Sequence, residues 1–241
     1  MAYEWHRPLE GKPLRFTLLT FAAVIVGGLV LLVPPFFLQG TFEVLPGLRP
    51  YSALELEGRD LYIREGCNVC HSQMIRPLAA ETERYGHYSV AGEGAYDRPF
   101  LWGSRRTGPD LARVGGKYPD SWHWRHLEDP RALEPRSNMP RFAFLLEAPL
   151  DTSLTARRMT VLRTLGHPYT DAEIANAERD ALAEADRIAE KLRAEGVSLA
   201  GPEARSEAIA VIAYLQSLGR AFKDAQSPSA APGGAAGVGG R

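Results

Sequence analysis

The sequence predicts a mainly α-helical protein that joins one N-terminal transmembrane helix to one exported domain with long loops. Three observations predict this fold class. One apolar segment near the N-terminus is long enough to cross a bilayer. Helix start and stop residues bracket several later segments. Residues 66–150 are dense in Gly, Pro and aromatic side chains with weak periodicity, so we expect loops there rather than strands.

The composition is that of a globular protein. Of its 241 residues, 45% are hydrophobic and 24% are charged, which excludes wholesale disorder, collagen and a disulfide-dense scaffold. The 28 basic and 29 acidic side chains give a formal net charge of -1. This balance gives no overall attraction to nucleic acid, so we expect no nucleic-acid partner.

The apolar segment covers residues 16–38, which are 23 consecutive residues without a charge. As a helix it would reach about 33 Å, enough to span a membrane. Pro34 and Pro35 lack backbone donors, so we expect the regular helix to end near Val33. A cleaved signal peptide would require a small-x-small site, which the Pro-Pro-Phe-Phe run does not offer. A core helix would show a polar face, and this segment shows none.

The charges beside this segment predict its orientation. Arg7, Lys12 and Arg15 precede it, and the next basic residue is Arg49. The positive-inside rule therefore places the N-terminus in the cytoplasm and everything after residue 40 outside. We expect a single-pass protein of the bacterial inner membrane with a periplasmic domain and contacts to membrane lipid.

The chain divides into four predicted parts. Residues 1–40 form the cytoplasmic N-terminus and anchor, residues 41–50 a linker rich in Pro and Gly, residues 51–225 one domain, and residues 226–241 a disordered tail rich in Gly, Ala and Pro. Within the domain we expect helices over residues 53–65, 171–194 and 207–218. Ser52 and Glu55 form a capping box, Thr170 caps the second helix, and Gly219 stops the third. The second helix is strongly charged and predicted to present a solvated face.

The chain contains two cysteines, and they stand in the run Cys67-Asn68-Val69-Cys70-His71. This spacing is typical of covalent attachment of a c-type haem. Residues i and i+3 lie on one face of a helical turn, so both thiols can reach the vinyl groups of a porphyrin, with His71 as the proximal iron ligand. A redox disulfide would require a thioredoxin-like βαβ context, and structural zinc would require distant histidines to complete its ligand set.

The sixth iron ligand must come from the opposite face of the haem. Met74 is too close to His71 in sequence to reach that face. Met139 precedes Pro140, which biases it toward an extended loop, so it is our preferred distal ligand. The alternatives are Met159, His87, His123, His126 or an open position.

Two further parts of a haem site have candidates. The turn at residues 107–111 contains Pro109 and could supply a rigid carbonyl to the free ring nitrogen of His71. The haem propionates need donors because buried carboxylates require partners. Trp102, Arg105 and Arg106 are the candidates for that role.

The surroundings of the haem motif resemble a known family. The stretches at residues 50–55, 58–77, 81–93 and 102–116 are similar to the membrane-anchored mono-haem subunit (subunit II) of cbb3-type cytochrome c oxidases. The resemblance implies a class I cytochrome c-like domain in which N-terminal and C-terminal helices cross beside the haem. It also implies one covalent haem c at Cys67 and Cys70, His71 and Met139 as axial ligands, and the Pro109 carbonyl bound to His71.

These predictions indicate that the protein carries electrons and does not itself reduce oxygen. The chain shows no copper-ligand histidine cluster, and a His/Met iron is closed to substrate. We expect a non-catalytic, electron-transfer subunit of an oxidase in aerobic respiration. Its expected partners are a haem-copper catalytic subunit, a further cytochrome c subunit, and a soluble or membrane cytochrome c donor. The alternatives are the cytochrome c subunit of nitric oxide reductase and a haem-c gas sensor.

Overall fold

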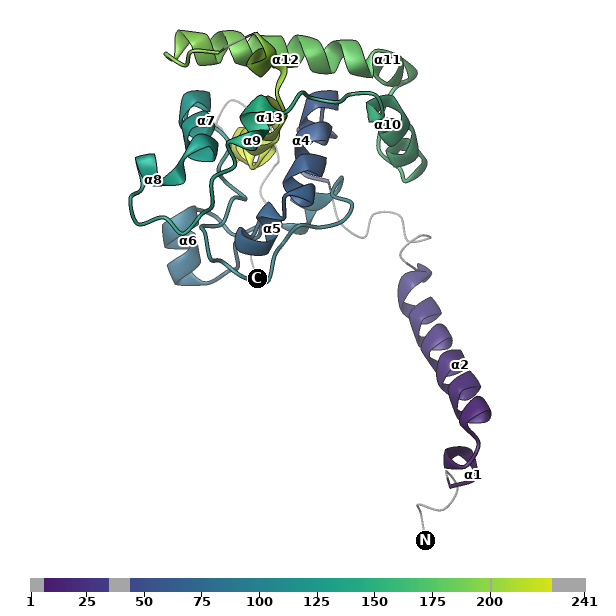
Figure 1. The fold of residues 1–241 in the computed structure, drawn as a ribbon. Helices are drawn as coiled ribbons and strands as arrows, with labels where there is room; N and C mark the ends of the chain where they lie inside the picture. The colour runs from purple at the N-terminus through teal and green to yellow at the C-terminus, as the bar shows by residue number, and fades with distance from the viewer. Residues whose placement is uncertain (1–6, 35–43, 200, 227–241) are drawn as a thin grey trace, which may run out of the picture. The chain divides into compact units, whose positions relative to one another are not determined.

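The computed structural model describes residues 7–34, 44–199 and 201–226, and it divides into two compact units, Met1–Glu43 and Val44–Arg241 (Figure 1). In the described ranges the named elements are all helices, and the one β-type pairing is an isolated bridge between Pro149 and Ser206. The mainly helical fold class is therefore confirmed. The predicted tail beyond Gln226 and residues 41–43 of the predicted linker lie outside the described residues.

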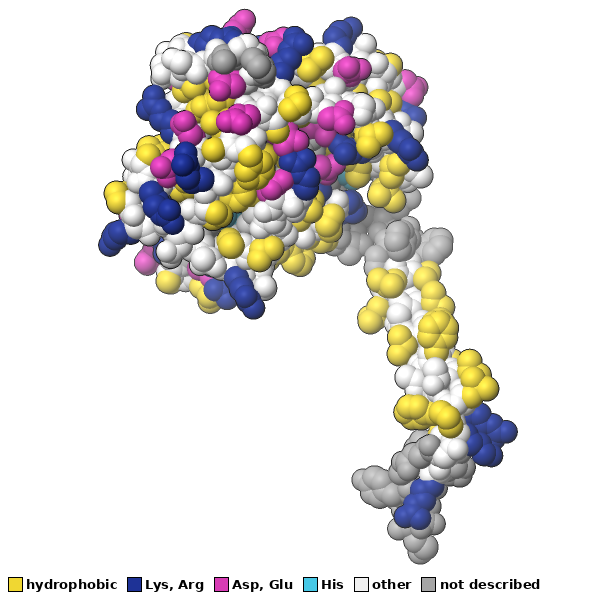
Figure 2. Space-filling view, viewed as in Figure 1, with side chains coloured by type: hydrophobic (Ala, Val, Ile, Leu, Met, Phe, Trp, Pro, Cys, Tyr) yellow, Lys and Arg dark blue, Asp and Glu magenta, His cyan; other side chains and the backbone are white. Residues whose placement is uncertain are grey.

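The first unit contains the short helix α1 (Arg7–Glu10) and the long helix α2 (Pro13–Leu32). Helix α2 begins with Pro13, whose fixed φ suits a first helical position, and ends one residue before Val33, close to the predicted end. None of its residues is buried, and it is long and apolar enough to cross a membrane. Figure 2 shows hydrophobic side chains along the visible face of this helix and basic side chains near its N-terminal end. One candidate transmembrane helix is therefore confirmed in the described part of the chain.

The second unit is built on two helices that pack against each other, α4 (Ala53–Arg64) and α13 (Glu207–Ser217). Both match the predicted helices at residues 53–65 and 207–218 within one residue at each end. Ser52 and Glu55 form both bonds of the predicted capping box. At the crossing, the rings of Tyr62 and Tyr214 lie 5.3 Å apart between centroids. The residues of α13 from Ala208 to Gln216 are buried, so this helix is a core element on all sides.

The charged helix predicted over residues 171–194 is two helices, α11 (Asp171–Ala175) and α12 (Ala177–Ala194). Thr170 caps the first as predicted, but Asn176 adopts φ −101° and ψ 5°, which interrupts the helix. The prediction of one continuous helix was therefore wrong, because the helix is interrupted at Asn176. Helix α12 buries an alanine-rich face against α4, α7 and α13, and most of its charged side chains are exposed, as predicted.

The remaining helices are short and surround this core. They are α5 (Cys67–Cys70), α6 (Ala79–Tyr85), η1 (Ala91–Gly94), α7 (Asp120–Glu128), α8 (Pro130–Leu133), α9 (Phe144–Glu147), α10 (Thr155–Thr164), η2 (Pro202–Arg205) and α14 (Arg220–Gln226). Residues 44–50, predicted as linker, lie in the second unit. There the Leu45 N–H donates to Gly92 O at 3.3 Å, and Arg49 pairs with Glu55 at 2.7 Å.

Candidate haem-binding site

The cysteine motif follows directly from the C-terminal end of α4. Gly66 adopts a positive φ of 68°, which lets the chain turn sharply into α5. Helix α5 is a single turn from Cys67 to Cys70, and the His71 N–H donates back to Cys67 O at 2.9 Å. The turn therefore carries both cysteines at i and i+3, on one face, with His71 next in the chain.

Both thiols are free. Cys67 is half-buried against the core and Cys70 is exposed. Burial raises the pKa of Cys67 to about 12, so its thiol stays protonated and is a poor redox nucleophile. In residues 7–34, 44–199 and 201–226, no three His, Cys, Asp or Glu side chains gather as a metal site. The described geometry therefore contains no feature that supports a redox disulfide or a structural zinc site at these cysteines.

His71 is oriented by a backbone carbonyl. Its Nδ1 lies 2.8 Å from Pro109 O, so the ring donates a hydrogen bond through Nδ1 and keeps Nε2 available. Burial lowers the pKa of His71 and favours the neutral imidazole, which is the form that binds metals. The structure thus brings together the two residues that the resemblance paired.

The turn that contains Pro109 is bonded to the cysteine turn on both sides of the proline. The Gly108 N–H donates to Cys70 O at 3.0 Å, and the Leu111 N–H donates to Ser72 O at 2.8 Å. The buried Asp110 carboxylate accepts the Ser72 hydroxyl at 2.6 Å and the Met74 N–H at 3.0 Å. The carbonyl that orients His71 is therefore fixed by backbone and carboxylate contacts together.

Gly108 is a site residue that the sequence analysis did not single out. A β-carbon built on Gly108 would lie 2.3 Å from Cε1 of His71 and 2.7 Å from its Nδ1. No larger residue fits beside the imidazole without moving it. In the sequence, the Gly-Pro pair inside the 107–111 turn was the one sign that Gly108 has a role in the site. Glycine often marks a place where the backbone lies close to another group.

We expect Gly108→Ala to displace either the His71 ring or the Pro109 turn. The clash should cost about 1–3 kcal/mol of folding free energy, as other overpacked sites do. Haem content and the visible spectrum of the purified chain are the measurements. Gly201→Ala is the matched control, because nothing lies within 4 Å of a β-carbon there. A Gly108→Ala protein with normal haem content, spectrum and stability would contradict the close contact.

Met139 lies in an extended loop between α8 and α9, as its position before Pro140 predicted. The side chain is half-buried against the hydrophobic core that also contacts Cys67. The loop is held to the end of α7, because the Phe142 N–H donates to Leu127 O at 2.8 Å and Arg141 Nε to Glu128 O at 3.0 Å. Met139 therefore sits on a fixed loop, and its role as an iron ligand stays a prediction.

The alternative distal ligands occupy different environments. Met159 is 2% exposed within α10 and fills the core, the commoner role of methionine. His87 is exposed, and its Nδ1 lies 2.8 Å from Tyr88 O. His123 is buried in α7, and burial lowers its pKa to about 4. His126 is half-buried on the same helix, and burial is the main cause that lowers its pKa.

The three propionate candidates differ in exposure and in the partners that they contact. Arg106 donates to Ser72 Oγ at 2.6 Å and to Glu81 Oε2 at 2.8 Å, so its guanidinium already serves the network around Asp110. Arg105 is exposed. Trp102 is half-exposed and stacks on Phe100 at 4.6 Å between ring centroids. A propionate role for Trp102, Arg105 and Arg106 stays a prediction.

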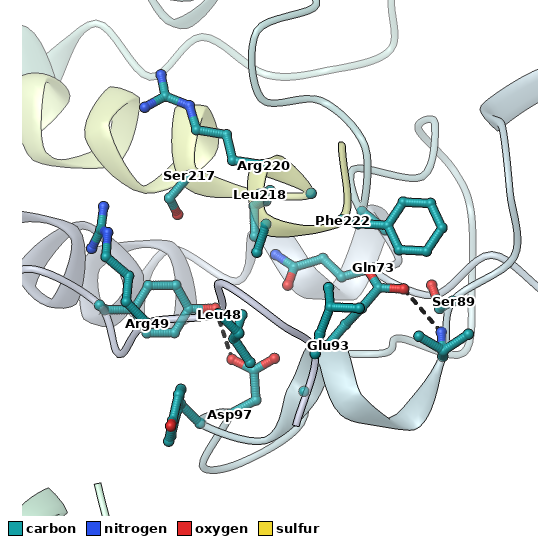
Figure 3. Close-up of a pocket in the computed structure, with 18 of the residues that line it drawn as sticks. Leu48, Arg49, Gln73, Ser89, Glu93, Asp97, Ser217, Leu218, Arg220 and Phe222 are labelled. Carbon is teal, nitrogen blue, oxygen red and sulfur yellow. Dashed lines mark hydrogen bonds between the residues drawn. The ribbon is translucent and has the colours of Figure 1, made fainter. Parts of the chain in front are cut away.

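Trp102 also lines a separate hollow of about 310 Å³, shown in Figure 3. Gln73 reaches into it between Leu218 and Glu93, and its Nε2 is buried without a hydrogen-bond partner in the described part of the chain. Neither the cysteines nor His71 nor Met139 lines this hollow. It is therefore distinct from the cysteine turn.

The described residues fit a haem by three observations. Two free thiols stand at i and i+3, a neutral imidazole is oriented with Nε2 available, and Gly108 leaves room for that ring. A family model for the cytochrome c oxidase mono-heme subunit/FixO matches residues 6–222. No curated protein matched the chain in a sequence comparison. The chain belongs to the mono-haem subunit (FixO) family of cytochrome c oxidases.

Proposed function

We propose that this chain carries one haem c bound covalently through Cys67 and Cys70, with His71 and Met139 as axial ligands. The observation that carries the proposal is the 2.8 Å contact between His71 Nδ1 and Pro109 O, directly after the cysteine turn. This carbonyl comes from a residue 38 positions along the chain rather than from the next residue, as it does at exposed His87, and a metal-ligating histidine is oriented in this way. The haem would supply a one-electron Fe(III)/Fe(II) couple.

The residues around the haem have separate tasks in this proposal. Cys67 and Cys70 would fix one edge of the porphyrin to the α5 turn. Pro109 holds the His71 ring in one orientation, and the bonds from the 134–143 loop to α7 hold Met139 in place. With both axial positions filled by protein, no site remains for oxygen, so the chain would transfer electrons without reducing oxygen itself.

We propose that the electrons pass to a haem-copper catalytic subunit of a cbb3-type oxidase. A cytochrome c, either soluble or membrane-bound, or a further cytochrome c subunit would supply them. Helix α2, with Arg7 and Lys12 before it and Arg15 in its first turn, supports an inner-membrane protein with a cytoplasmic N-terminus and a periplasmic haem domain. Membership of an oxidase family favours this assignment over a nitric oxide reductase subunit.

The double variant Cys67→Ala with Cys70→Ala is expected to yield an exported chain that carries no haem after denaturing electrophoresis. The loss should be complete, because no thioether bond can form. In-gel haem staining measures it. Val69→Ala is the matched control, since Val69 is an exposed residue of the same turn. Retained staining in the double variant would overturn covalent attachment at these positions.

A further inference from the structure

Helix α10 presents large apolar side chains to solvent. Leu154, at its N-terminal end, is 49% exposed, and Val161 and Leu165 are each 55% exposed. Positions i, i+7 and i+11 lie on one face of a helix, so these three side chains form a single stripe. A different face of the helix buries Thr155 and Met159 in the domain. The stripe is therefore an outward-facing apolar surface.

A hollow of about 360 Å³ lies along the same face of α10. Its walls come from α10, from α4 and from the loop at residues 96–98. Leu154 and Val161 belong both to the hollow and to the stripe, so the two are one continuous surface, called here the α10 surface. Figure 2 shows hydrophobic and basic side chains side by side over this part of the molecule. The arginines that line the hollow are Arg59, Arg98, Arg157 and Arg158.

Two of these arginines are neutralised by carboxylates. Arg158 Nε lies 3.2 Å from Asp60, and its guanidinium also pairs with the buried Glu57. Arg59 Nε lies 3.6 Å from the Asp97 carboxylate. Asp60 is the one acidic residue that lines the hollow, and Arg158 already occupies it. These pairs contribute no net positive charge to the α10 surface.

The other two arginines have no carboxylate partner among the described residues. Arg98 donates to the backbone carbonyl of Asp97 at 2.9 Å and lies 6.0 Å from the centroid of the Phe100 ring. Arg157 is exposed and has no ion pair or hydrogen bond with any residue that the structure describes. The hollow therefore holds two guanidinium groups whose charge is not compensated, beside an apolar stripe.

We propose that the α10 surface binds an anionic phospholipid of the membrane. Guanidinium groups bind phosphate through several N–H donors at once, so Arg98 and Arg157 would hold the headgroup phosphate in the hollow. The stripe of Leu154, Val161 and Leu165 would contact the acyl chains. Basic side chains beside exposed apolar ones are typical of helices that lie at a membrane surface. The same chain contains α2, which is long and apolar enough to cross a membrane.

The first test measures thermal unfolding of the full-length chain with its haem, purified in mild detergent. Dihexanoyl phosphatidylglycerol, which is anionic and has short acyl chains, is expected to raise the unfolding midpoint by several degrees, because a ligand of the folded state stabilises it. Dihexanoyl phosphatidylcholine lacks the net charge and glycerol phosphate lacks the chains, so neither should shift the midpoint. An equal shift with either of these two compounds would overturn the inference.

Variants locate this response on the α10 surface. Arg98→Gln with Arg157→Gln is expected to abolish the shift caused by phosphatidylglycerol and to keep the midpoint measured without lipid, because neither arginine has a carboxylate partner. Arg187→Gln with Arg193→Gln is the matched control, since it removes the same charge from exposed positions of α12. A full response in the Arg98 and Arg157 variant would place the lipid elsewhere and overturn the inference.

A second test distinguishes lipid from a partner protein. A nitroxide is attached to Val161→Cys in the full-length chain, which is reconstituted in nanodiscs containing phosphatidylglycerol, and wild type gives the background from Cys67 and Cys70. Contact with acyl chains should expose the nitroxide to oxygen and shield it from a water-soluble nickel chelate. Glu190→Cys, at an exposed position of α12, should show the solvent pattern. A Val161→Cys label that is open to nickel in nanodiscs, and shielded only in the assembled oxidase, would assign the α10 surface to a partner subunit instead.

Discussion

Replacing His71 with alanine is expected to abolish cytochrome c-dependent oxygen uptake by the assembled oxidase. The imidazole would supply the proximal bond to the iron, and the structure assigns it a dedicated carbonyl partner, Pro109, at 2.8 Å. Without the ring, the iron of the proposed haem would lack a strong-field ligand and would have an open position, so its reduction potential and its affinity for water would both change. The porphyrin would remain attached through Cys67 and Cys70, and haem staining should persist.

Oxygen consumption by the purified complex measures this effect, and subunit composition on a gel checks that the complex has assembled. His87→Ala is the matched control, because it removes a histidine from an exposed position. Uptake should fall to background in the first variant and stay near wild type in the second. Normal uptake from a fully assembled complex with His71→Ala would show that electrons bypass this haem.

Replacing Gly58 with alanine is expected to lower the stability of the protein strongly. We expect this added methyl group to cost more stability than one added at any other position of α4 or α13. A β-carbon at Gly58 would lie 1.9 Å from Ala210 O and 2.9 Å from Tyr214 Cβ. The backbone oxygen cannot move away without separating the two helices. Alanine improves helix propensity by about 1 kcal/mol over glycine, but overpacking of a tight core costs about 3 kcal/mol or more when backbone must shift. The clash therefore outweighs the propensity.

Thermal unfolding of the full-length chain in detergent, followed by circular dichroism, gives the measurement. The Gly58→Ala midpoint should fall by several degrees or the protein should fail to accumulate. Gly28→Ala is the control, because Gly28 also lies in a helix and nothing within 4 Å would meet its new methyl group. Equal midpoints for the two variants would contradict the close approach of α4 and α13.

Local patterns were read correctly from the sequence. The Ser52 and Glu55 capping box depends on residues three apart, and it placed the start of α4. Gly219 marked the end of α13 in the same way. The cysteine turn is a local motif as well, because one helical turn places both thiols and leads directly into His71. Such elements depend on short-range geometry that is present in the chain before it folds.

Other elements could not be predicted because they depend on contacts between distant segments. Helix α7 has no side-chain cap, and its buried residues include His123 and Asp120, so its apolar period is weak. The role of Arg106 depends on Glu81, which is 25 residues away. Likewise, Gly108 matters only because the His71 ring lies against it. In each case the tertiary structure gives the residue its role.

The hydrogen-bond acceptor for His71 Nδ1 is a backbone carbonyl, and this affects whether electron transfer is coupled to proton transfer. The carbonyl of Pro109 has no proton to gain or lose over the range in which proteins stay folded, whereas a carboxylate in that place would take up a proton when its charge became unfavourable. The hydrogen bond at 2.8 Å therefore keeps the donor strength of His71 the same in acidic and neutral surroundings. With His71 as the proposed ligand, electrons would enter and leave on this side of the haem without a matching proton.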